Sequence, residues 1–106
     1  MHNVAVQIVR FVDISFPGWV ECELVDVDGR RHILKDKVPT FTVEDLDAES
    51  KYPVPGSVAC EVVERYQNEK GQQYVRISTT NPYHIESTEG VSEFTVFAGL
   101  VSSSHD

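Results

Sequence analysis

Apolar and polar residues alternate along the first part of the chain, and this period of two is typical of β-strands with one buried face. The apolar even positions of the first segment are Val4, Val6, Ile8, Val12, Ile14 and Phe16. The alternation predicts a long strand over residues 3–16. Pro17 and Gly18 interrupt it, and the pattern resumes from Val20 to Leu24.

The hydrophobic pattern also predicts the register of this first hairpin. A two-residue loop would place the apolar residues of the first strand opposite Glu21 and Glu23, whereas the three-residue loop Pro17-Gly18-Trp19 keeps them on one face. The expected pairs are Phe16 with Val20, Ile14 with Cys22, and Val12 with Leu24. This register leaves Trp19 at the loop tip, partly in water.

Two later turns carry glycine at the third loop position, where a type I turn with a bulge needs a left-handed residue. These turns are Val27-Asp28-Gly29 and Glu69-Lys70-Gly71. The first predicts the pairs Asp26–Arg30, Cys22–Leu34 and Leu24–His32, and it sets Asp26 between Arg10 and Arg30. The second predicts the pairs Tyr66–Tyr74, Glu64–Arg76 and Val63–Ile77, which combine an aromatic pair and an ion pair on one face.

The middle and the end of the chain are less regular. The run Thr42-Val43-Glu44-Asp45 resembles a capping box and predicts one short helix near residues 42–48. Prolines exclude regular sheet interior for residues 51–56, and residues 82–92 form a polar loop. Residues 93–102 are apolar on both faces, as in a central strand, and residues 102–106 are expected to be a frayed tail.

This order of elements predicts a single all-β domain over residues 1–106. Three hairpin-linked strands, a short helix, a second hairpin and a last strand are similar to the order of an OB-fold with one strand added. We therefore expect a small, partly open antiparallel barrel of about six strands. A two-sheet β-sandwich is the alternative.

Composition narrows the classes of partner and compartment. Seventeen acidic and nine basic residues give a net charge of −8, which disfavours nucleic acid and anionic membranes. The first residues do not resemble a signal peptide, and no segment approaches the length of a membrane span. Cys22 and Cys60 stand in apolar runs without metal-ligand spacing, so we expect buried free thiols in a cytoplasmic protein.

Motifs for known chemistries are absent from the sequence. It contains no phosphate-binding loop, dinucleotide fingerprint, zinc-protease motif or serine-hydrolase elbow. The four histidines do not share metal-ligand spacing, so we expect no metal, no cofactor and no identifiable catalytic residue. The richest polar cluster lies in the 82–92 loop, where His84 with Glu86 or Glu89 is a candidate acid–base pair beside hydroxyl groups.

A second set of candidates is aromatic. Trp19 is expected at a turn, while Tyr66 and Tyr74 share a face with Glu64 and Arg76. Partly exposed Trp, Tyr and Arg side chains are typical anchors of protein interfaces. The neighbours of Trp19 include Glu21 and Glu23 rather than basic residues, which argues against base stacking.

Three segments carry a resemblance to other sequences: Phe16-Pro17-Gly18-Trp19-Val20-Glu21-Cys22, Lys37-Val38-Pro39 and Glu86-Ser87-Thr88-Glu89-Gly90. They look like short bacterial all-β proteins without an assigned function, and the resemblance implies no activity or site.

The residues favour an acidic protein-interaction module rather than an enzyme. It would bind a protein partner or a second copy through the residues Trp19, Tyr66, Tyr74, Arg76, His84 and Glu86, and an inhibitor or immunity-type partner of a basic enzyme is one specific form. The alternative is a small-molecule-binding or hydrolytic barrel that uses the 82–92 loop. The sequence does not identify the partner.

Overall fold

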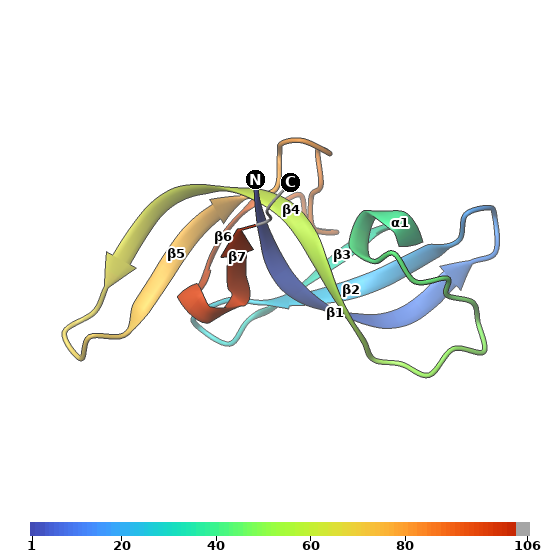
Figure 1. Ribbon diagram of the computed structural model, residues 1–106, viewed down its shortest axis with the longest axis horizontal. Helices are drawn as coiled ribbons and strands as arrows, with labels where there is room; N and C mark the ends of the chain where they lie inside the picture. Colours follow the sequence, from blue (N-terminus) through green and yellow to red (C-terminus); the bar gives the residue numbers. More distant parts are fainter. Residues whose placement is uncertain (104–106) are drawn as a thin grey trace.

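Seven antiparallel strands form one curled sheet in the computed structural model, which describes residues 1–103 (Figure 1). The strands are β1 (His2–Asp13), β2 (Trp19–Val25), β3 (Arg31–Lys37), β4 (Val54–Gln67), β5 (Gln73–Ser78), β6 (Glu93–Phe97) and β7 (Val101–Ser103). Six of them follow the order β3-β2-β1-β4-β5-β6, and β7 pairs with β1. The sheet is an open half-barrel with OB-like strand order and one short α-helix, as the sequence predicts.

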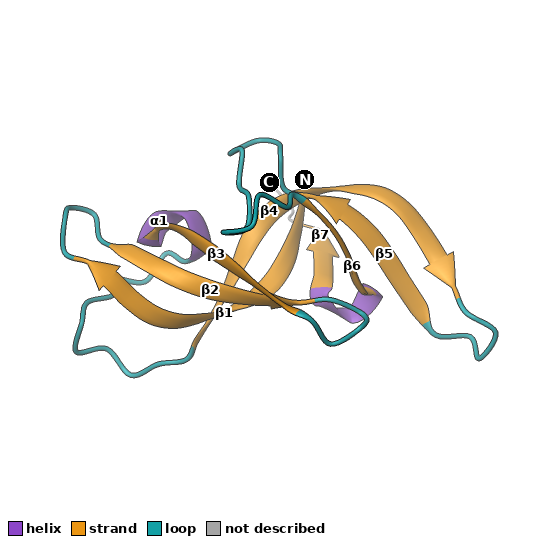
Figure 2. Cartoon of the chain, turned by 180° about the vertical axis from the view of Figure 1, so that it is seen from behind, coloured by secondary structure: helices purple, strands orange, loops and turns teal. Residues whose placement is uncertain are grey.

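The C-terminal segment returns to the first strand. After Phe97 the chain makes a short 3-10 turn, η1 (Ala98–Leu100), and β7 then pairs with residues 2–4 of β1 (Figure 2). The prediction of one central strand over residues 93–102 is therefore wrong. Phe94 and Val96 of β6 are buried, Ala98, Leu100 and Val101 are partly buried against the same core, and Phe97 is 38% exposed. Ser102 and Ser103 lie in β7, and residues 104–106 of the expected tail lie outside the described residues.

The first hairpin differs from the prediction in length and register. β1 ends at Asp13, and Cys22 is opposite Ile8 rather than Ile14. Irregularities between residues 8 and 10 and between residues 11 and 13 each place an extra residue in β1. Because one inserted residue reverses which side chains face the core, the even-position pattern stops being the buried one. Ile14 and Phe16 are 86% and 97% exposed at the hairpin tip.

The two glycine turns are where the sequence predicts them. Gly29 and Gly71 have φ values of +80° and +81°. The predicted pairs Cys22–Leu34, Leu24–His32, Tyr66–Tyr74 and Glu64–Arg76 are all present.

Two predicted details of these hairpins are wrong. Ile77 pairs with Val62 rather than Val63, because a bulge between residues 62 and 64 leaves Val63 46% exposed. Asp26 does not lie between two arginines: its carboxylate contacts His32 at 2.8 Å, although its main chain pairs with Arg30 as expected.

The helix α1 (Val38–Phe41) lies earlier than the predicted 42–48 helix. Pro39 stands in its first turn, where no intrahelical N–H is needed, and Val38 and Phe41 are buried. Thr42 ends this helix, and its hydroxyl accepts a hydrogen bond from the amide of Glu44 in the following loop. The capping pattern therefore indicates a local turn rather than a helix start.

One core fills the concave side of the sheet. Its fully buried side chains include Val4, Ile8, Val20, Leu24, Leu34, Val58, Val75, Ile77 and Val96. Cys22 and Cys60 are free and buried in it, as predicted. No helix among residues 1–103 is long and apolar enough to cross a membrane.

The open side of the half-barrel is bridged by loops. The amide of Val27 donates to the carbonyl of Thr95 on β6 at 2.9 Å. On the other side of β3, Ser87 forms an isolated bridge with Leu34, and the amide of Thr88 donates to the carbonyl of Ile33. The 82–92 loop therefore ties β3 to the second hairpin.

Candidate functional site

Three of the six predicted interface residues, Tyr66, Tyr74 and Arg76, lie on the outward face of strands β4, β5 and β6. Tyr66 is opposite Tyr74, which is opposite Phe97, so three aromatic residues form a row across three strands. In the neighbouring row Glu64 is opposite Arg76. Directly opposite residues share a face of the sheet, and we name these five residues the Tyr–Arg face. The positions between them on β5 and β6, such as Val75 and Val96, point into the core.

The two tyrosines are held in a fixed geometry. Their rings are stacked with centroids 5.1 Å apart and an interplanar angle of 25°, a contact worth about 0.5–1.5 kcal/mol beyond its buried area. The Tyr66 hydroxyl donates to Oε1 of Glu64 at 2.9 Å, and this bond to a carboxylate raises the pKa of Tyr66. Both rings are half-buried, so the stack offers an ordered aromatic surface to solvent.

Arg76 is clamped between two carboxylates. Its Nη2 donates to Oε1 of Glu64 at 3.1 Å, and its Nε lies 3.6 Å from Oε1 of Glu93. The Nε atom is buried without a hydrogen-bond partner, while the side chain as a whole is 40% exposed. The guanidinium is therefore fixed in place and retains free N–H donors toward solvent.

Phe97 completes the row and was missed by the sequence interpretation. It is 38% exposed at the end of β6 and lies directly opposite Tyr74 of β5. The sequence signal that could identify it is its position opposite Tyr74. That position becomes visible only once the register between β5 and β6 is known.

Trp19 lies apart from this face. It begins β2 rather than occupying a loop tip, it is half-buried, and Lys37 Nζ lies 5.7 Å from the centre of its ring. The β1–β2 loop before it and the β4–β5 turn stand at opposite ends of the molecule (Figure 1). The structure does not bring Trp19 together with the two tyrosines.

His84 and Glu86 are both exposed in the 82–92 loop. In the described part of the chain, no hydrogen bond joins their side chains, and neither of them lines a pocket. The loop is instead held by its buried residues, Ile85 and Ser87. The Ser87 hydroxyl accepts hydrogen bonds from the amides of Glu89 and Val91.

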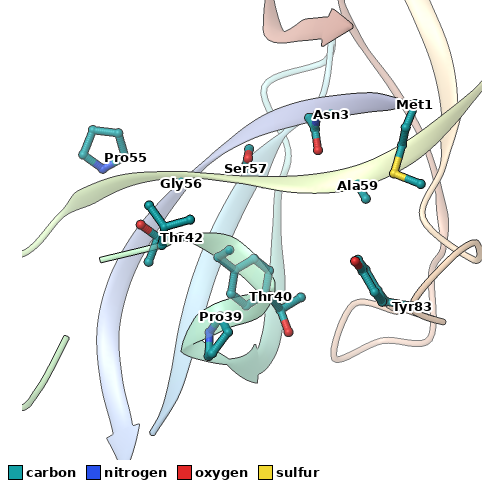
Figure 3. Close-up of a pocket in the computed structure, with 12 residues that line it drawn as sticks. Met1, Asn3, Pro39, Thr40, Thr42, Pro55, Gly56, Ser57, Ala59 and Tyr83 are labelled. Carbon is teal, nitrogen blue, oxygen red and sulfur yellow. The ribbon is translucent and has the colours of Figure 1, made fainter. Parts of the chain in front are cut away.

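A groove of about 530 Å³ runs between α1, the first half of β4 and Tyr83 (Figure 3). We name it the β4 groove. No charged side chain lines it; its walls are Met1, Asn3, Pro39, Thr40, Phe41, Thr42, Val43, Pro55, Gly56, Ser57, Ala59 and Tyr83.

Neither metal chemistry nor a known relative adds to this description. Residues 1–103 contain no group of three or more His, Cys, Asp or Glu side chains placed to hold a metal ion. No family model, curated protein or solved structure matches the chain.

Proposed function

We propose that this protein is an interaction module that binds a partner protein through the Tyr–Arg face. The observation that carries the proposal is the row Tyr66–Tyr74–Phe97 beside a clamped Arg76 on one partly exposed sheet face. Aromatic and arginine side chains are enriched in interface cores and supply most of the residues whose truncation weakens binding strongly.

The face is preorganised for binding. The ring stack and the hydrogen bonds through Glu64 fix side chains that would otherwise lose rotamer freedom on association. Immobilising such a side chain on binding costs about 0.5–1.5 kcal/mol. Because these side chains are already fixed in the free protein, binding does not incur this cost again. The sheet below is rigid because Val75, Ile77 and Val96 are buried in the core.

Charge indicates the kind of partner. The chain carries a net charge of −8, and Glu64 and Glu93 flank Arg76 on this face. A partner with a basic rim around an apolar centre is complementary to this arrangement, and opposite charges would speed association. The proposal needs no cofactor, and it places the chain in the cytoplasm, where buried thiols such as Cys22 and Cys60 remain reduced.

Site-specific photo-crosslinking in the native host tests the proposal. A benzophenone amino acid replaces Phe97 in one variant and Phe16, an exposed aromatic at the other end of the molecule, in the control. We expect the Phe97 variant to capture a defined protein that the control does not capture. If the captured protein is a second copy of the chain, the result would support the Tyr–Arg face as the binding surface and identify self-association as its use. Identical capture from both positions would contradict the proposal.

Arginine substitutions provide a matched comparison. Arg76 lies on the Tyr–Arg face, whereas Arg65 is opposite the buried Val75 and belongs to the other side of the strand. We expect Arg76→Ala and Tyr74→Ala each to weaken binding of the captured partner by about tenfold or more. Arg65→Ala is expected to leave the Kd within about twofold. Equal effects of the two arginine substitutions would show that only net charge matters.

A further inference from the structure

The first half of β4 has an edge without a strand partner. Residues 54–60 pair with β1 on one side, and pairing with β5 begins only at Glu61. Pro55, Gly56, Ser57 and Ala59 of β4 line the β4 groove, whose lining also includes Met1 and Asn3 of the first strand segment (Figure 3). An edge of this kind presents main-chain N–H and C=O groups that are able to pair with another extended chain.

Pro55 identifies which main-chain groups point into the groove. It has no N–H, yet it lies opposite Gln7 in a regular antiparallel ladder. Opposite pairs in such a ladder alternate between those that exchange hydrogen bonds and those that do not, so Gln7–Pro55 is of the second kind. The pairs at Ser57 and Ala59, two and four residues further on, are of the same kind. Their N–H and C=O groups therefore point away from β1.

Within residues 1–103, neither α1 nor the 82–92 loop supplies a main-chain partner for these groups of Ser57 and Ala59. Natural edge strands are usually protected by charged side chains or by prolines. Here Pro55 protects only the start of the edge, and Ser57 and Ala59 carry small side chains.

The groove is bounded by α1 and by Tyr83. On one side α1 approaches β4 closely, since a Cβ at Gly56 would lie 3.0 Å from the carbonyl oxygen of Phe41. Beyond this contact the groove continues along Ser57 and Ala59 to Tyr83, which is 60% exposed (Figure 3). The open edge is therefore recessed between α1 and Tyr83.

We propose that the β4 groove binds an extended peptide segment of a partner protein, which adds as a strand to β4 at Ser57 and Ala59. Unpaired main-chain groups recognise an extended backbone, and the walls of the groove supply side-chain selectivity. The β4 edge of a second copy does not fit the recess, because it is flanked by the same two walls. No charged side chain lines the groove, and Glu44, Asp45 and Glu61 lie near its ends in sequence. The matching peptide is thus apolar or β-branched at its centre and basic at its flanks.

Selection from a random peptide library is the first test. A phage-displayed library of twelve-residue peptides is selected on the full chain, and we expect sequences poor in Asp and Glu with Val, Ile or Thr between Lys or Arg residues. Ser57→Pro removes the N–H that points into the groove and leaves the β1 ladder intact, because Ser57 does not donate to β1. We expect Ser57→Pro to weaken binding of the enriched peptides by about tenfold or more. The matched control Ser57→Thr should retain binding.

Amide exchange on the unmodified chain keeps the test independent of how Ser57→Pro folds. In the free protein, the amides of Ser57 and Ala59 are expected to exchange faster than those of Gly56 and Val58, which donate to β1. Binding of an enriched peptide should slow hydrogen exchange at the amides of both Ser57 and Ala59. The proposal is overturned by a selection that enriches no peptide on the wild-type chain, by equal binding to Ser57→Pro, or by unchanged exchange at Ser57 and Ala59.

This inference does not rest on the Tyr–Arg face. Tyr74→Ala is expected to leave binding of the enriched peptides unchanged, and Ser57→Pro is expected to leave photo-crosslinking from position 97 unchanged. The two proposals therefore fail separately.

Discussion

Thr79 anchors the 82–92 loop from inside the protein. It is fully buried, and its hydroxyl donates to the carbonyl of Ile85 at 2.7 Å and lies 3.3 Å from the carbonyl of Ser92. Its main chain adds two bonds, because its amide donates to Ser92 and its carbonyl accepts from Ile85. One residue thus holds both sides of the loop that carries Tyr83, a wall of the β4 groove.

Replacing Thr79 by valine isolates the hydroxyl. The side chain keeps its shape, but the carbonyl of Ile85, a residue that is itself buried, loses its donor. Leaving a buried acceptor unpaired costs about 1–3 kcal/mol. Thr79→Ser keeps the donor and removes one methyl group, which costs about 1 kcal/mol. We therefore expect valine to destabilise the protein more than serine, although valine is the more hydrophobic residue.

Urea denaturation followed by Trp19 fluorescence measures the difference. With m values of about 1–3 kcal/mol/M for a small protein, the Thr79→Val midpoint should fall by roughly 1 M. Far-UV circular dichroism of the same samples reports whether the sheet unfolds in the same transition. The assignment of Thr79 as a hydrogen-bonded anchor would be refuted if the unfolding free energy of Thr79→Val lay within about 0.5 kcal/mol of the wild-type value. It would also be refuted if Thr79→Val were more stable than Thr79→Ser.

Three further predictions concern buried thiols, a carboxylate and a turn. Burial raises the pKa of the Cys22 thiol to about 12 and that of Cys60 to about 11. A disulfide reagent at pH 8 should therefore label the two thiols only when urea has unfolded the protein. Rapid labelling of the native protein would contradict this prediction. Burial of the Asp26 carboxylate raises its pKa, but hydrogen bonds from His32 and from two backbone amides outweigh this and leave the pKa below its usual value. Such a group contributes stability above its unfolded pKa of about 4 and loses it as the pH falls through the folded value. Asp26→Asn should thus lower the free energy of unfolding at pH 7, and the difference from the wild type should disappear as the pH is lowered. A difference in unfolding free energy that stays constant with pH would contradict this linkage. Gly18 has φ +95°, and an added Cβ would lie 3.0 Å from a ring carbon of Phe11 on β1. Gly18→Ala should therefore lower the stability of the protein by at least about 1–2 kcal/mol, and an unchanged Tm would contradict this prediction.

Local rules predicted most of the second hairpin and part of the first. In β4 and β5 the glycine turn ending at Gly71 and the alternating pattern agree, so the pair Tyr66–Tyr74 followed from the sequence. In β1 two inserted residues reverse the buried face, and a bulge has no marker in the sequence. Ile14 and Phe16 continue the even pattern but lie outside the strand.

The candidate surfaces depend on contacts between distant segments. Phe97 joins the Tyr–Arg face only through the register of β5 and β6, and the long loop between these strands does not fix that register. The β4 groove depends on where α1 packs. The hydroxyl of Thr42 suggested a helix after residue 42, whereas the buried Val38 and Phe41 place the helix before it. Tertiary burial therefore outweighed the local capping signal.

The most direct test of the central claim is the footprint of the captured partner on the labelled chain. Amide chemical shifts of the ¹⁵N-labelled protein are followed while the partner is added. We predict that the shifted amides cluster at residues 64–66, 74–76 and 95–97, around the Tyr–Arg face. Shifts confined to the β1–β2 loop at residues 14–18, or spread without a cluster, would contradict it.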